Sequence, residues 1–472
     1  MNKDEIRFIP AYEIREVIKR GEMSSQEITE IIIERIEKIN PKLNAYCTPT
    51  FELAREAAKE ADEAIKKGGN LGMLHGIPIS IKDEMPMKGI RTTFGSKLYE
   101  NHIPEEEDIS VQRLRNEGSV ILGKTNMPEF GFLAVTNNMI FGESHNPWNL
   151  DKTPGGSTGG GAAAVVSGLC YLSLGADGGG SIRIPSSLCG AYGIKPSFGR
   201  VPVYPTSGLH FESLIHYGPI VRFVKDAALM LDAMKGPHEA DMYTLPEQNL
   251  SYFEKVDEKP NKLKIGYSVD LGFSKVIDSE VKENVVKSAE KFTQLGWDVE
   301  KTKFKIKNPE RCFLTLYSIT IGYDLMNEIK KNREIINQDL VKAAELGLGS
   351  TGMDVARAMN LRKKFYHQFY QYFRDYDILI TPTTNLPAFE LGIIYPSVIE
   401  GKMVSPTAWM PFTAIFNLTG LPAASIPCGW SKDGLPIGMQ IIGRRFDDLT
   451  VLQVSKAFEE IAPWQDKKPT FN

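Results

Sequence analysis

Short runs of β-branched and aliphatic residues, separated by longer polar segments, restrict the fold of this chain more than any other feature. Two such runs lie at residues 77–81 and 119–122, and glycine or proline marks their ends. Runs of this length and composition predict strands, and the polar segments between them predict helices. Because helices that alternate with strands cover the faces of a sheet, the pattern predicts an α/β protein with a largely buried sheet.

The first part of the chain has the periodicity of helices. Residues 11–67 are predicted to be helical, and Ser24 and Glu27 have the spacing of a capping box at a helix N-terminus. Isoleucines follow at helical spacing and predict one face packed on a core. They are Ile28, Ile31, Ile32, Ile36 and Ile39.

A change in composition marks a boundary in the second half of the chain. Residues 236–261 are rich in Pro, Glu and Asn, and a new series of predicted elements follows them. These elements are a strand at 263–267, a helix at 279–295 stopped by Gly296, a strand at 297–304, a helix at 353–373 and a strand at 377–380. The first three predict a peripheral βαβ-like unit.

The bulk composition favours a globular protein with a small substrate. The chain has 472 residues, of which 42% are hydrophobic and 24% are charged, values typical of proteins with a sizeable core. Lys and Arg number 55 against 59 Asp and Glu, so the net charge is only −4 and no overall field attracts nucleic acid or an anionic membrane. A small, uncharged or weakly charged substrate is therefore expected.

Cysteine usage and the N-terminal residues predict a cytoplasmic protein with no membrane partner. The N-terminus, MNKDE, has no apolar core of a signal peptide, and the most apolar stretch, residues 161–176, is too short and too broken by glycine to span a bilayer. The five cysteines are odd in number and never spaced as a pair of metal ligands, which fits free thiols in a reducing compartment. They are Cys47, Cys170, Cys189, Cys312 and Cys428.

Glycine is concentrated in residues 155–180, where ten of 26 positions are glycine, about four times the average of the chain. Such density predicts backbone that passes close to another group or takes dihedrals that a Cβ forbids. A phosphate-binding loop is disfavoured because no Gly-Lys-Ser/Thr sequence is present, and a flexible linker because apolar and charged residues are mixed into the segment. In the third interpretation, the amides of Gly178, Gly179, Gly180 and Ser181 point inward as an oxyanion hole for acyl transfer.

A serine nucleophile such as Ser181 needs a base within hydrogen-bond reach. Histidine is the usual base, but no histidine lies in a recognisable triad context, and the seven are His75, His102, His145, His210, His216, His238 and His367. A lysine can serve instead when burial favours its neutral form, and Lys82 lies at the end of the apolar run 77–81. The alternative interpretation of Lys82 is a solvated lysine at a strand end or a partner of Asp83.

The order of several sequence blocks resembles the amidase signature family. The blocks are GIPISIKD, GKTNMPEFG, NPWNLDKTPGGSTGGGAAAVVSG, DGGGSIRIPSSLCGAYGIKPSFGRV, NLTGLPAASIPCG and GLPIGMQIIG, and they span most of the chain. The resemblance implies an α/β fold with a three-layer α/β/α sandwich around a wide mixed β-sheet. It also implies a catalytic Ser, cis-Ser, Lys arrangement that requires no metal and no cofactor.

The resemblance is carried onto this chain residue by residue. The Ser of the DGGGS block becomes the nucleophile, Ser181, and the first hydroxyl residue of the GGST block becomes the bridging serine, Ser157. The Lys of the IKD block becomes the base, Lys82. The two serines lie 24 positions apart (181 minus 157), which is the spacing of the family motif.

Two residues near the nucleophile depart from the family pattern. Thr158 stands where relatives usually have serine, and we expect its hydroxyl to support Lys82. The residue at the position of Gly178 is often bulkier in relatives, so a wider oxyanion loop is expected here. Asp177 and Arg183 flank the loop and are interpreted as a buried ion pair that fixes its shape rather than as direct catalysts. Cys312 is left without a role, since no base for a thiol nucleophile is found near it.

The family divides into small-molecule amidases and the glutaminase subunit of the tRNA-dependent amidotransferase. The latter carries an aspartate ahead of its counterpart of the NLTGLPAASIPCG block, whereas residues 409–417 contain no acid, so the glutaminase subunit is kept only as the alternative. The apolar character of this stretch and of residues after Asn126 predicts a pocket for aryl or aliphatic acyl amides. Its expected lining is Phe130, Gly131, Phe132, Trp409 and Phe412, with Met139 close by.

The pattern also resembles aryl acylamidases, cyclic nylon-oligomer hydrolases and carbamate-cleaving members, so esters and carbamates (urethanes) are expected as side substrates. We expect a single amidase domain over 1–472, with a helical segment at 1–67, the signature core at 68–235, a peripheral α/β part at 236–375 and a return to the core sheet at 376–472. The expected partner is a small-molecule amide or carbamate, and the expected assembly is a monomer or homodimer. A catalytically silent scaffold protein is disfavoured because all three triad positions are filled.

Overall fold

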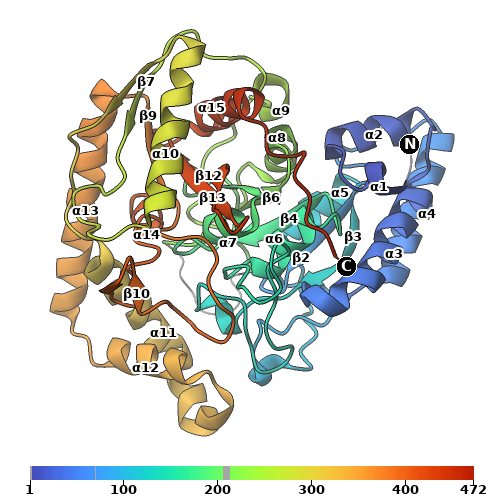
Figure 1. The fold of residues 1–472 in the computed structure, drawn as a ribbon. Helices are drawn as coiled ribbons and strands as arrows, with labels where there is room; N and C mark the ends of the chain where they lie inside the picture. Colours follow the sequence, from blue (N-terminus) through green and yellow to red (C-terminus); the bar gives the residue numbers. More distant parts are fainter. Residues whose placement is uncertain (1–2, 70, 206–212, 472) are drawn as a thin grey trace.

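A mixed β-sheet of eleven strands forms the centre of the molecule (Figure 1). The structure, a computed structural model, describes residues 3–69, 71–205 and 213–471. In chain order the strands of this sheet are β1 (Tyr46–Pro49), β2 (Pro78–Lys82), β3 (Val120–Thr125), β4 (Leu172–Ala176), β5 (Tyr192–Lys195), β6 (Tyr217–Val221), β7 (Lys264–Tyr267), β8 (Asp298–Lys301), β9 (Ile378–Pro382), β12 (Ala423–Trp430) and β13 (Pro436–Ile442). A separate two-stranded sheet contains β10 (Val398–Ile399) and β11 (Lys402–Met403).

Across the large sheet the strands follow the order β1-β3-β2-β4-β6-β5-β12-β13-β9-β7-β8. Strand β2 runs parallel to β3 and β4, and β7 runs parallel to β8 and β9. The other neighbouring pairs are antiparallel. The wide mixed sheet that the family resemblance implies is therefore confirmed.

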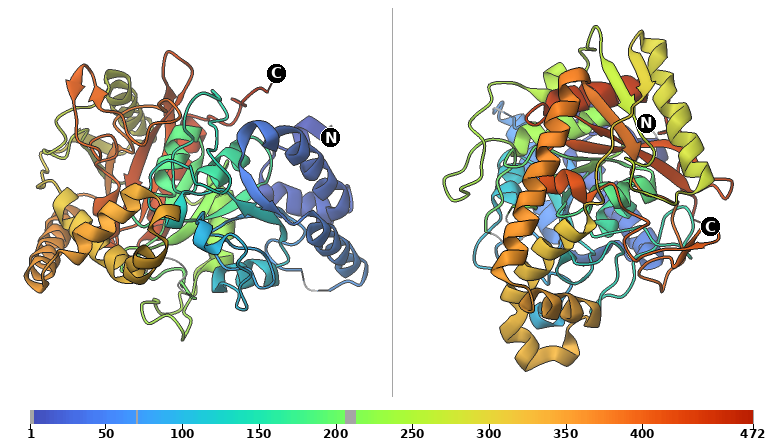
Figure 2. Two further views of the ribbon diagram at one scale, coloured as in Figure 1. Left: turned by 90° about the horizontal axis from the view of Figure 1, so that it is seen from below. Right: turned by 90° about the vertical axis from the view of Figure 1, so that its left-hand side faces the viewer.

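Helices surround this sheet and extend beyond both of its ends. The helices of the first half are α1 (Lys3–Ile6), α2 (Ala11–Lys19), α3 (Ser25–Leu43), α4 (Phe51–Lys66), α5 (Ile109–Asn116), α6 (Gly159–Val166), α7 (Arg183–Cys189) and α8 (Val224–Met234). Those of the second half are α9 (Tyr252–Lys255), α10 (Ser279–Lys291), α11 (Glu310–Asn332), α12 (Gln338–Leu348), α13 (Gly352–Asp375), α14 (Ala414–Thr419) and α15 (Asp448–Ile461). Short 3₁₀ helices lie at Lys97–Tyr99, Glu129–Gly131, Phe292–Leu295 and Arg333–Ile335. Figure 2 shows the N-terminal helices at one end of the molecule and α11 to α13 at the opposite end.

Strand β9 shows how the sheet separates two hydrophobic cores. Ile378 and Ile380 belong to a buried cluster that includes residues of α10 and α15. Leu379, between them, belongs to a second cluster that includes residues of α13 and α14. Because successive side chains of a strand point to opposite faces, helices lie on both sides of the sheet. The three-layer α/β/α sandwich is therefore confirmed.

The N-terminal helices form largely as the sequence predicts. The Ser24 hydroxyl accepts the amide of Glu27 at 3.1 Å, and the Glu27 carboxylate accepts the amide of Ser24 at 2.8 Å, which completes the capping box of α3. The row of isoleucines on α3 is buried. The prediction of helix throughout residues 11–67 is wrong at β1, because this segment pairs with β3 and tertiary pairing overrides local pattern in so short a strand.

The second half of the chain contains the predicted βαβ unit as β7, α10 and β8. Gly296, with φ of 77°, ends the 3₁₀ extension of α10, and β8 is shorter than predicted. Strands β7 and β8 form one edge of the large sheet. The sequence predicts no element at the helical hairpin of α11 and α12. Helix α11 packs against both α12 and α13, so it lacks the single apolar face that would have revealed it as a helix.

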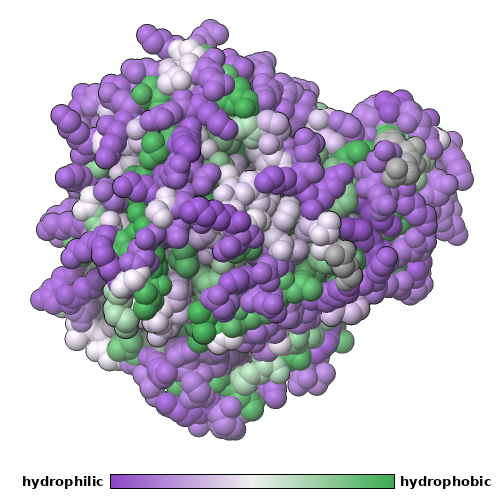
Figure 3. Space-filling model, viewed as in Figure 1, coloured by the Kyte–Doolittle hydropathy of each residue, from purple (hydrophilic) through white to green (hydrophobic). Residues whose placement is uncertain are grey.

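Polar side chains cover most of the face of the molecule shown in Figure 3, and hydrophobic side chains are scattered among them. No helix in the described ranges is long and apolar enough to cross a lipid bilayer. The buried apolar residues of the long helices α11 and α13 belong to the second core of the sandwich.

Candidate active site

The parallel pairing of β2 with β4 brings together two segments that lie far apart in the sequence. Ile81 of β2 lies beside Leu174 of β4. The carboxyl ends of parallel strands meet at the same edge of a sheet, where open α/β proteins place their sites. Lys82 ends β2 at this edge, and the glycine-rich loop that follows β4 carries Ser181.

Lys82 and Ser157 make a buried contact at this edge. Lys82 Nζ donates to Ser157 Oγ at 2.7 Å, and each of the two residues is 1% exposed. The peptide bond between Gly156 and Ser157 is cis, as the family resemblance implies. The amide of Thr158 donates to the carbonyl of Ser181 at 3.1 Å, and the Ser181 residue is partly exposed. The segments that carry Lys82, Ser157 and Ser181 are therefore assembled in one place.

Two glycines of the site have no room for a side chain. A Cβ on Gly160, at the start of α6, would lie 2.6 Å from the amide nitrogen of Asn126. Gly180 has φ of +133°, and a Cβ there would lie 2.6 Å from the Thr413 hydroxyl oxygen. The glycine density of residues 155–180 thus reflects close backbone approach and dihedrals that other residues avoid.

A buried carboxylate fixes the loop between β4 and α7. Asp177 accepts the amide of Gly180 at 2.8 Å and the Arg183 guanidinium at 2.9 and 3.0 Å. Arg183 also donates to Gln440 at 2.8 Å and to Asn417 at 2.7 Å. Both charged side chains are fully buried, so the predicted ion pair is confirmed. Burial alone would raise the pKa of Asp177, but the charge and hydrogen bonds of Arg183 hold it well below its usual range.

The predicted oxyanion hole is wrong at one position, Gly180. The amide of Gly180 is donated to Asp177 and is therefore not available to a tetrahedral intermediate. The amides of Gly178, Gly179 and Ser181 make no hydrogen bond to any residue that the structure describes. These three amides are candidate oxyanion donors, whereas Gly180 shapes the loop.

Thr158 also differs from its predicted role. Its hydroxyl donates to the carbonyl of Ala176 at the end of β4, at 3.3 Å, rather than to Lys82. Its methyl group packs closely on Gly161 of α6 and Gly175 of β4, where an added Cβ would lie 3.2 and 3.0 Å from it. Threonine at this position therefore joins α6 to β4 and does not support the lysine.

Lys82 has a second close neighbour that the sequence pattern does not single out. The Glu84 carboxylate lies 2.6 Å from Lys82 Nζ, and the two side chains are 11% and 1% exposed, respectively. Asp83 instead lies 3.6 Å from Lys124 Nζ and accepts the amide of Thr93 at 3.1 Å. Lys82 is therefore neither a solvated lysine nor a partner of Asp83.

No histidine in the described ranges hydrogen-bonds to Ser157 or Ser181. His75, His145 and His216 each make a ring-nitrogen hydrogen bond with a backbone carbonyl. Burial and the nearby charge of Lys195 hold the pKa of His216 well below its usual value, so this ring is neutral. His210 lies outside the described residues. The lysine therefore remains the candidate base of the site.

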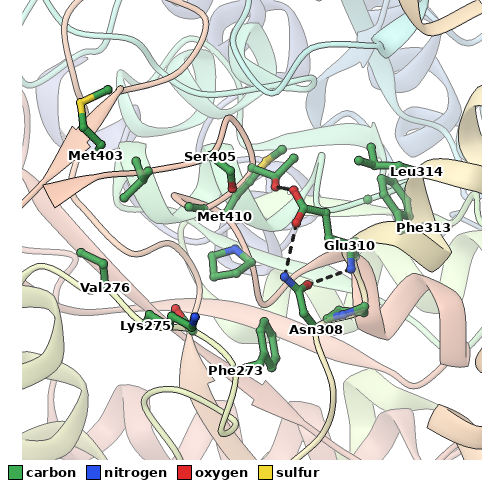
Figure 4. Close-up of a pocket in the computed structure, with 18 residues that line it drawn as sticks. Phe273, Lys275, Val276, Asn308, Glu310, Phe313, Leu314, Met403, Ser405 and Met410 are labelled. Atoms are coloured by element: carbon green, nitrogen blue, oxygen red, sulfur yellow. Dashed lines mark hydrogen bonds between the residues drawn. The ribbon is translucent and has the colours of Figure 1, made fainter. Parts of the chain in front are cut away.

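A cavity of about 350 Å³ adjoins the loop that carries Ser181, at Gly179 (Figure 4). The Phe313 ring lies directly over this glycine, since a Cβ there would be 2.7 Å from Phe313 Cζ. The apolar side chains that line the cavity come from three parts of the chain. They include Phe273, Phe313, Leu314, Met403 and Met410.

A small polar group interrupts this apolar lining. Glu310, at the start of α11, accepts the Thr407 hydroxyl on one carboxylate oxygen and the Asn308 side-chain amide on the other, the latter at 3.3 Å. Figure 4 shows these contacts at the cavity wall. Lys275 also lines the cavity but is exposed to solvent.

A model of the Amidase family matches residues 27–452, which is most of the chain. The chain belongs to the amidase signature family. An acylamidase of Rhodococcus erythropolis is 35% identical over 474 residues, covering 99% of this chain and 98% of the relative. A subunit of the glutamyl-tRNA(Gln) amidotransferase of Caldanaerobacter subterraneus subsp. tengcongensis is 36% identical, and the match covers 98% of each chain. The solved structure of a bacterial aryl acylamidase superposes with a TM-score of 0.91 at 31% identity, over 97% of each chain.

This membership makes the protein an amidase-signature amidohydrolase.

Two of the residues predicted to line the substrate pocket lie in the hydrophobic core instead. Trp409 packs edge-on against Phe389 and is 1% exposed, and Phe412 is fully buried beside Phe273. Neither side chain lines the cavity. Large aromatic residues in an apolar stretch are as suited to core packing as to lining a pocket, and here both side chains pack in the core.

The other three predicted pocket residues, Phe130, Gly131 and Phe132, also lie away from the cavity lining. An added Cβ on Gly131 would lie 3.2 Å from Ser157 Oγ, which places this glycine beside the bridging serine. Phe130 is buried, and the ring of Phe132 stacks on Tyr317 of α11. Gly131 thus lies beside Ser157, but none of the three residues lines this cavity as predicted.

The lining residues that the sequence misses come from elements without a motif. Phe273 follows β7 and Phe313 lies on α11, so only the tertiary fold brings them to the loop at Gly179. Met410 lies within the apolar stretch 409–417, whose composition was the one available signal.

Cys312 does not line the cavity. Its thiol donates to the carbonyl of Ala358 on α13 at 3.2 Å, and burial raises the pKa of the thiol to about 11. Within the described residues, no three or more His, Cys, Asp or Glu side chains are grouped so that they could hold a metal ion.

Proposed function

We propose that this amidase cleaves the C–N bond of small, hydrophobic or aryl amides through an acyl-enzyme on Ser181. The observation that carries the proposal is the buried contact of 2.7 Å between Lys82 Nζ and Ser157 Oγ, next to the Ser181 loop. Lysine is almost never fully buried unless it is paired, and a lysine in its neutral form is a competent general base. Ser157 is then the only hydroxyl bonded to Lys82 among the described residues.

The proposed reaction uses this contact as a proton route. Ser181 Oγ attacks the substrate carbonyl carbon and gives its proton to Ser157, while Ser157 gives its own proton to neutral Lys82. The free amides of the loop, on Gly178, Gly179 and Ser181, bind the oxyanion that forms. The amine leaves with a proton returned along the same route, and water then attacks the Ser181 ester in the same way.

The lining of the cavity at Gly179 supports an apolar acyl or amine group on the substrate. Phe313 lies over the loop, and Phe273, Leu314 and Met410 extend the apolar wall. Sites with mostly apolar walls and few polar groups bind hydrophobic small molecules. The similarity to an acylamidase and to an aryl acylamidase points in the same direction.

Carbamates and esters are proposed as further substrates of the same site. A carbamate presents the same carbonyl group to the nucleophile and the same developing oxyanion to the loop amides. Because the proposed chemistry requires no feature that only an amide possesses, aryl carbamates and nitrophenyl esters should also acylate Ser181. Purified enzyme that cleaves anilides but leaves both of these classes untouched contradicts this part of the proposal.

Glutamine is the second candidate substrate, as in the glutaminase subunit of a tRNA-dependent amidotransferase. One observation favours it: Glu310 places a carboxylate in the cavity wall, where a substrate ammonium group could bind. Both oxygens of Glu310 already accept hydrogen bonds from Thr407 and Asn308, and the rest of the lining is largely apolar. We therefore place glutamine second to an uncharged amide.

The first experiment tests the nucleophile and the base. A fluorophosphonate should label Ser181, as seen by mass spectrometry of the intact protein and its peptides. Ser181→Ala should lose labelling and turnover, and Lys82→Ala should lose amidase activity at neutral pH by about 10²-fold or more. Lys88→Ala, which changes an exposed lysine six residues further on, is the matched control and should keep wild-type activity. Full activity in Ser181→Ala or Lys82→Ala overturns the mechanism.

The second experiment separates the two substrate classes. Acetanilides, aliphatic amides, aryl carbamates and glutamine are compared by kcat/KM, in the wild type and in Glu310→Gln. For an uncharged amide substrate, anilides should exceed glutamine in the wild type and Glu310→Gln should change their kcat/KM little. For a glutaminase, glutamine should lead, and loss of the Glu310 charge should lower its kcat/KM selectively because the ammonium group loses its counter-charge.

A further inference from the structure

The Glu84 carboxylate is the charged group nearest to the proposed catalytic base. It lies 2.6 Å from Lys82 Nζ, while Ser157 Oγ lies 2.7 Å from the same nitrogen. Glu84 is 9% exposed, so its contact with Lys82 is only weakly screened by solvent. Lys82 Nζ therefore has both a hydroxyl and a carboxylate as close neighbours.

This arrangement fits the valences of the lysine nitrogen in both of its protonation states. A neutral amine has a lone pair that can accept the Ser157 proton while the nitrogen stays 2.6 Å from the Glu84 carboxylate. After that transfer, the nitrogen is an ammonium whose charge lies against the carboxylate. A carboxylate in contact with a base stabilises the cation that forms during attack.

We infer that Glu84 is a positioning residue that sets the pH range and the rate of the proposed Ser181 chemistry by acting on Lys82. This inference rests on the proposed function of Ser181 and Lys82. Glu84 holds the nitrogen toward Ser157 and stabilises the ammonium form. The contact therefore has two expected kinetic consequences: it places the acidic limb of kcat/KM at higher pH, and it lowers the barrier of the step in which the base takes the proton.

Within the described residues, Glu84 is the charged group that lies closest to Lys82. Tyr317 of α11 and Tyr217 of β6 interact electrostatically with Glu84. Burial, and to a lesser degree the Glu84 charge, raises the pKa of each phenol far above its usual range, so both are neutral at working pH. Asp83, next to Lys82 in the chain, interacts with Lys124 instead.

The test is the pH profile of kcat/KM for an anilide in Glu84→Gln. The amide keeps the size of the side chain and one acceptor oxygen but removes the charge. The midpoint of the acidic limb should move to lower pH by about one unit or more, since an opposite charge at this distance shifts such a midpoint by that amount. On the plateau, kcat should fall about tenfold or more because the forming ammonium loses its counter-charge, while KM changes little.

A second readout excludes an effect on substrate binding. The rate of fluorophosphonate labelling of Ser181 depends on the same base, so its acidic limb should move with that of kcat/KM. Glu84→Asp keeps the charge and should restore a limb close to that of the wild type. Glu129→Gln is the matched control: this buried carboxylate accepts the amide of Asn337 at 2.6 Å, makes no contact with Lys82, and its loss should leave the limb in place.

The outcomes separate this inference from the proposed function. Wild-type enzyme that neither hydrolyses any amide nor labels at Ser181 overturns the proposed function itself. Wild-type enzyme that does both, together with Glu84→Gln whose acidic limb stays at the wild-type pH, overturns the inference about Glu84 alone. A limb that moves equally in Glu84→Gln and Glu84→Asp also overturns it, since the charge is then not what sets the profile.

Discussion

Replacing Arg183 by methionine tests how far the nucleophile loop depends on one buried ion pair. Arg183 donates to Asp177 at 2.9 and 3.0 Å, to Gln440 at 2.8 Å and to the carbonyl of Thr413 at 3.0 Å. Methionine keeps most of the volume of the side chain but removes all of these bonds. The Asp177 carboxylate then stays buried without its guanidinium partner, and Lys195 is the remaining cation that interacts with it.

The magnitude follows from this loss of one partner. Removing one member of a buried ion pair costs about 3–5 kcal/mol of folding free energy, because the remaining charge is left without compensation. Asp177 and Arg183 are both 0% exposed, so no solvent screening reduces this figure. The double variant Asp177→Asn, Arg183→Met removes both charges and should recover much of the loss, since apolar or neutral replacements of whole buried pairs are often tolerated.

The pH dependence has a definite sign. In the wild type the pKa of Asp177 is lowered, so its contribution to stability is present above the unfolded-state pKa and is lost only as pH falls through the folded-state value. In Arg183→Met the burial that opposes ionisation is no longer outweighed, and the pKa of Asp177 should rise above its usual value. The deficit of the variant should therefore be largest at neutral pH and shrink as the solution is made acidic.

Urea denaturation followed by tryptophan fluorescence, at pH 7 and at lower pH, measures these changes. Lys287→Met is the control, because its ion pair with Glu283 is exposed to solvent and should contribute nothing measurable. The reasoning is refuted by an Arg183→Met variant as stable as this control at neutral pH. It is equally refuted if Asp177→Asn adds its own full cost to that of Arg183→Met, since the two charges are then not coupled.

Two further changes test the cavity and a buried cap. Gly179→Ala places a Cβ 2.7 Å from Phe313 Cζ, so the ring, which lines the cavity, must shift. The kcat/KM for anilides should fall, and Phe313→Leu in the same chain should restore part of it. Burial raises the pKa of Asp108, the N-cap of α5, to about 7 against the hydrogen bonds of the Ser110 and Val111 amides. The stability that this group contributes is present at low pH and is lost as pH rises through about 7. Asp108→Asn should therefore be more stable than the wild type above that pH and equally stable towards about pH 4. The midpoints of urea denaturation measure this difference.

Sequence reasoning identified segments that the fold does bring together, and these segments carry the proposed triad. Ser157, Ser181 and Lys82 lie in blocks whose order and spacing are specific, and the glycines around them are required by backbone approach. The ion pair of Asp177 and Arg183 was also predicted, since a charged pair in an apolar loop has few other uses. The oxyanion donors were predicted only in part, because the sequence does not reveal that Gly180 gives its amide to Asp177.

The substrate cavity was the least predictable part of the site. Its lining combines α11, the segment after β7 and the region of Met403 and Met410. Phe412 and Trp409 had the same apolar character as these residues, yet they pack into cores. Side-chain type alone does not show whether a residue lies in a core or lines a pocket, because both environments are apolar. The path of the backbone determines which of the two an apolar side chain faces.

By itself, the sequence determined the fold class, the family and the positions of the proposed nucleophile, bridging serine and base, because periodicity and motif spacing are local properties of the chain. The tertiary structure alone decided which groups contact Lys82 and the Ser181 loop. It turned Asp83 toward Lys124 and placed Glu84 against Lys82, it assigned the Gly180 amide to Asp177, and it brought Phe313 over Gly179. Contacts between distant elements depend on the order of the strands and the packing of the helices, and no single segment of the sequence determines either.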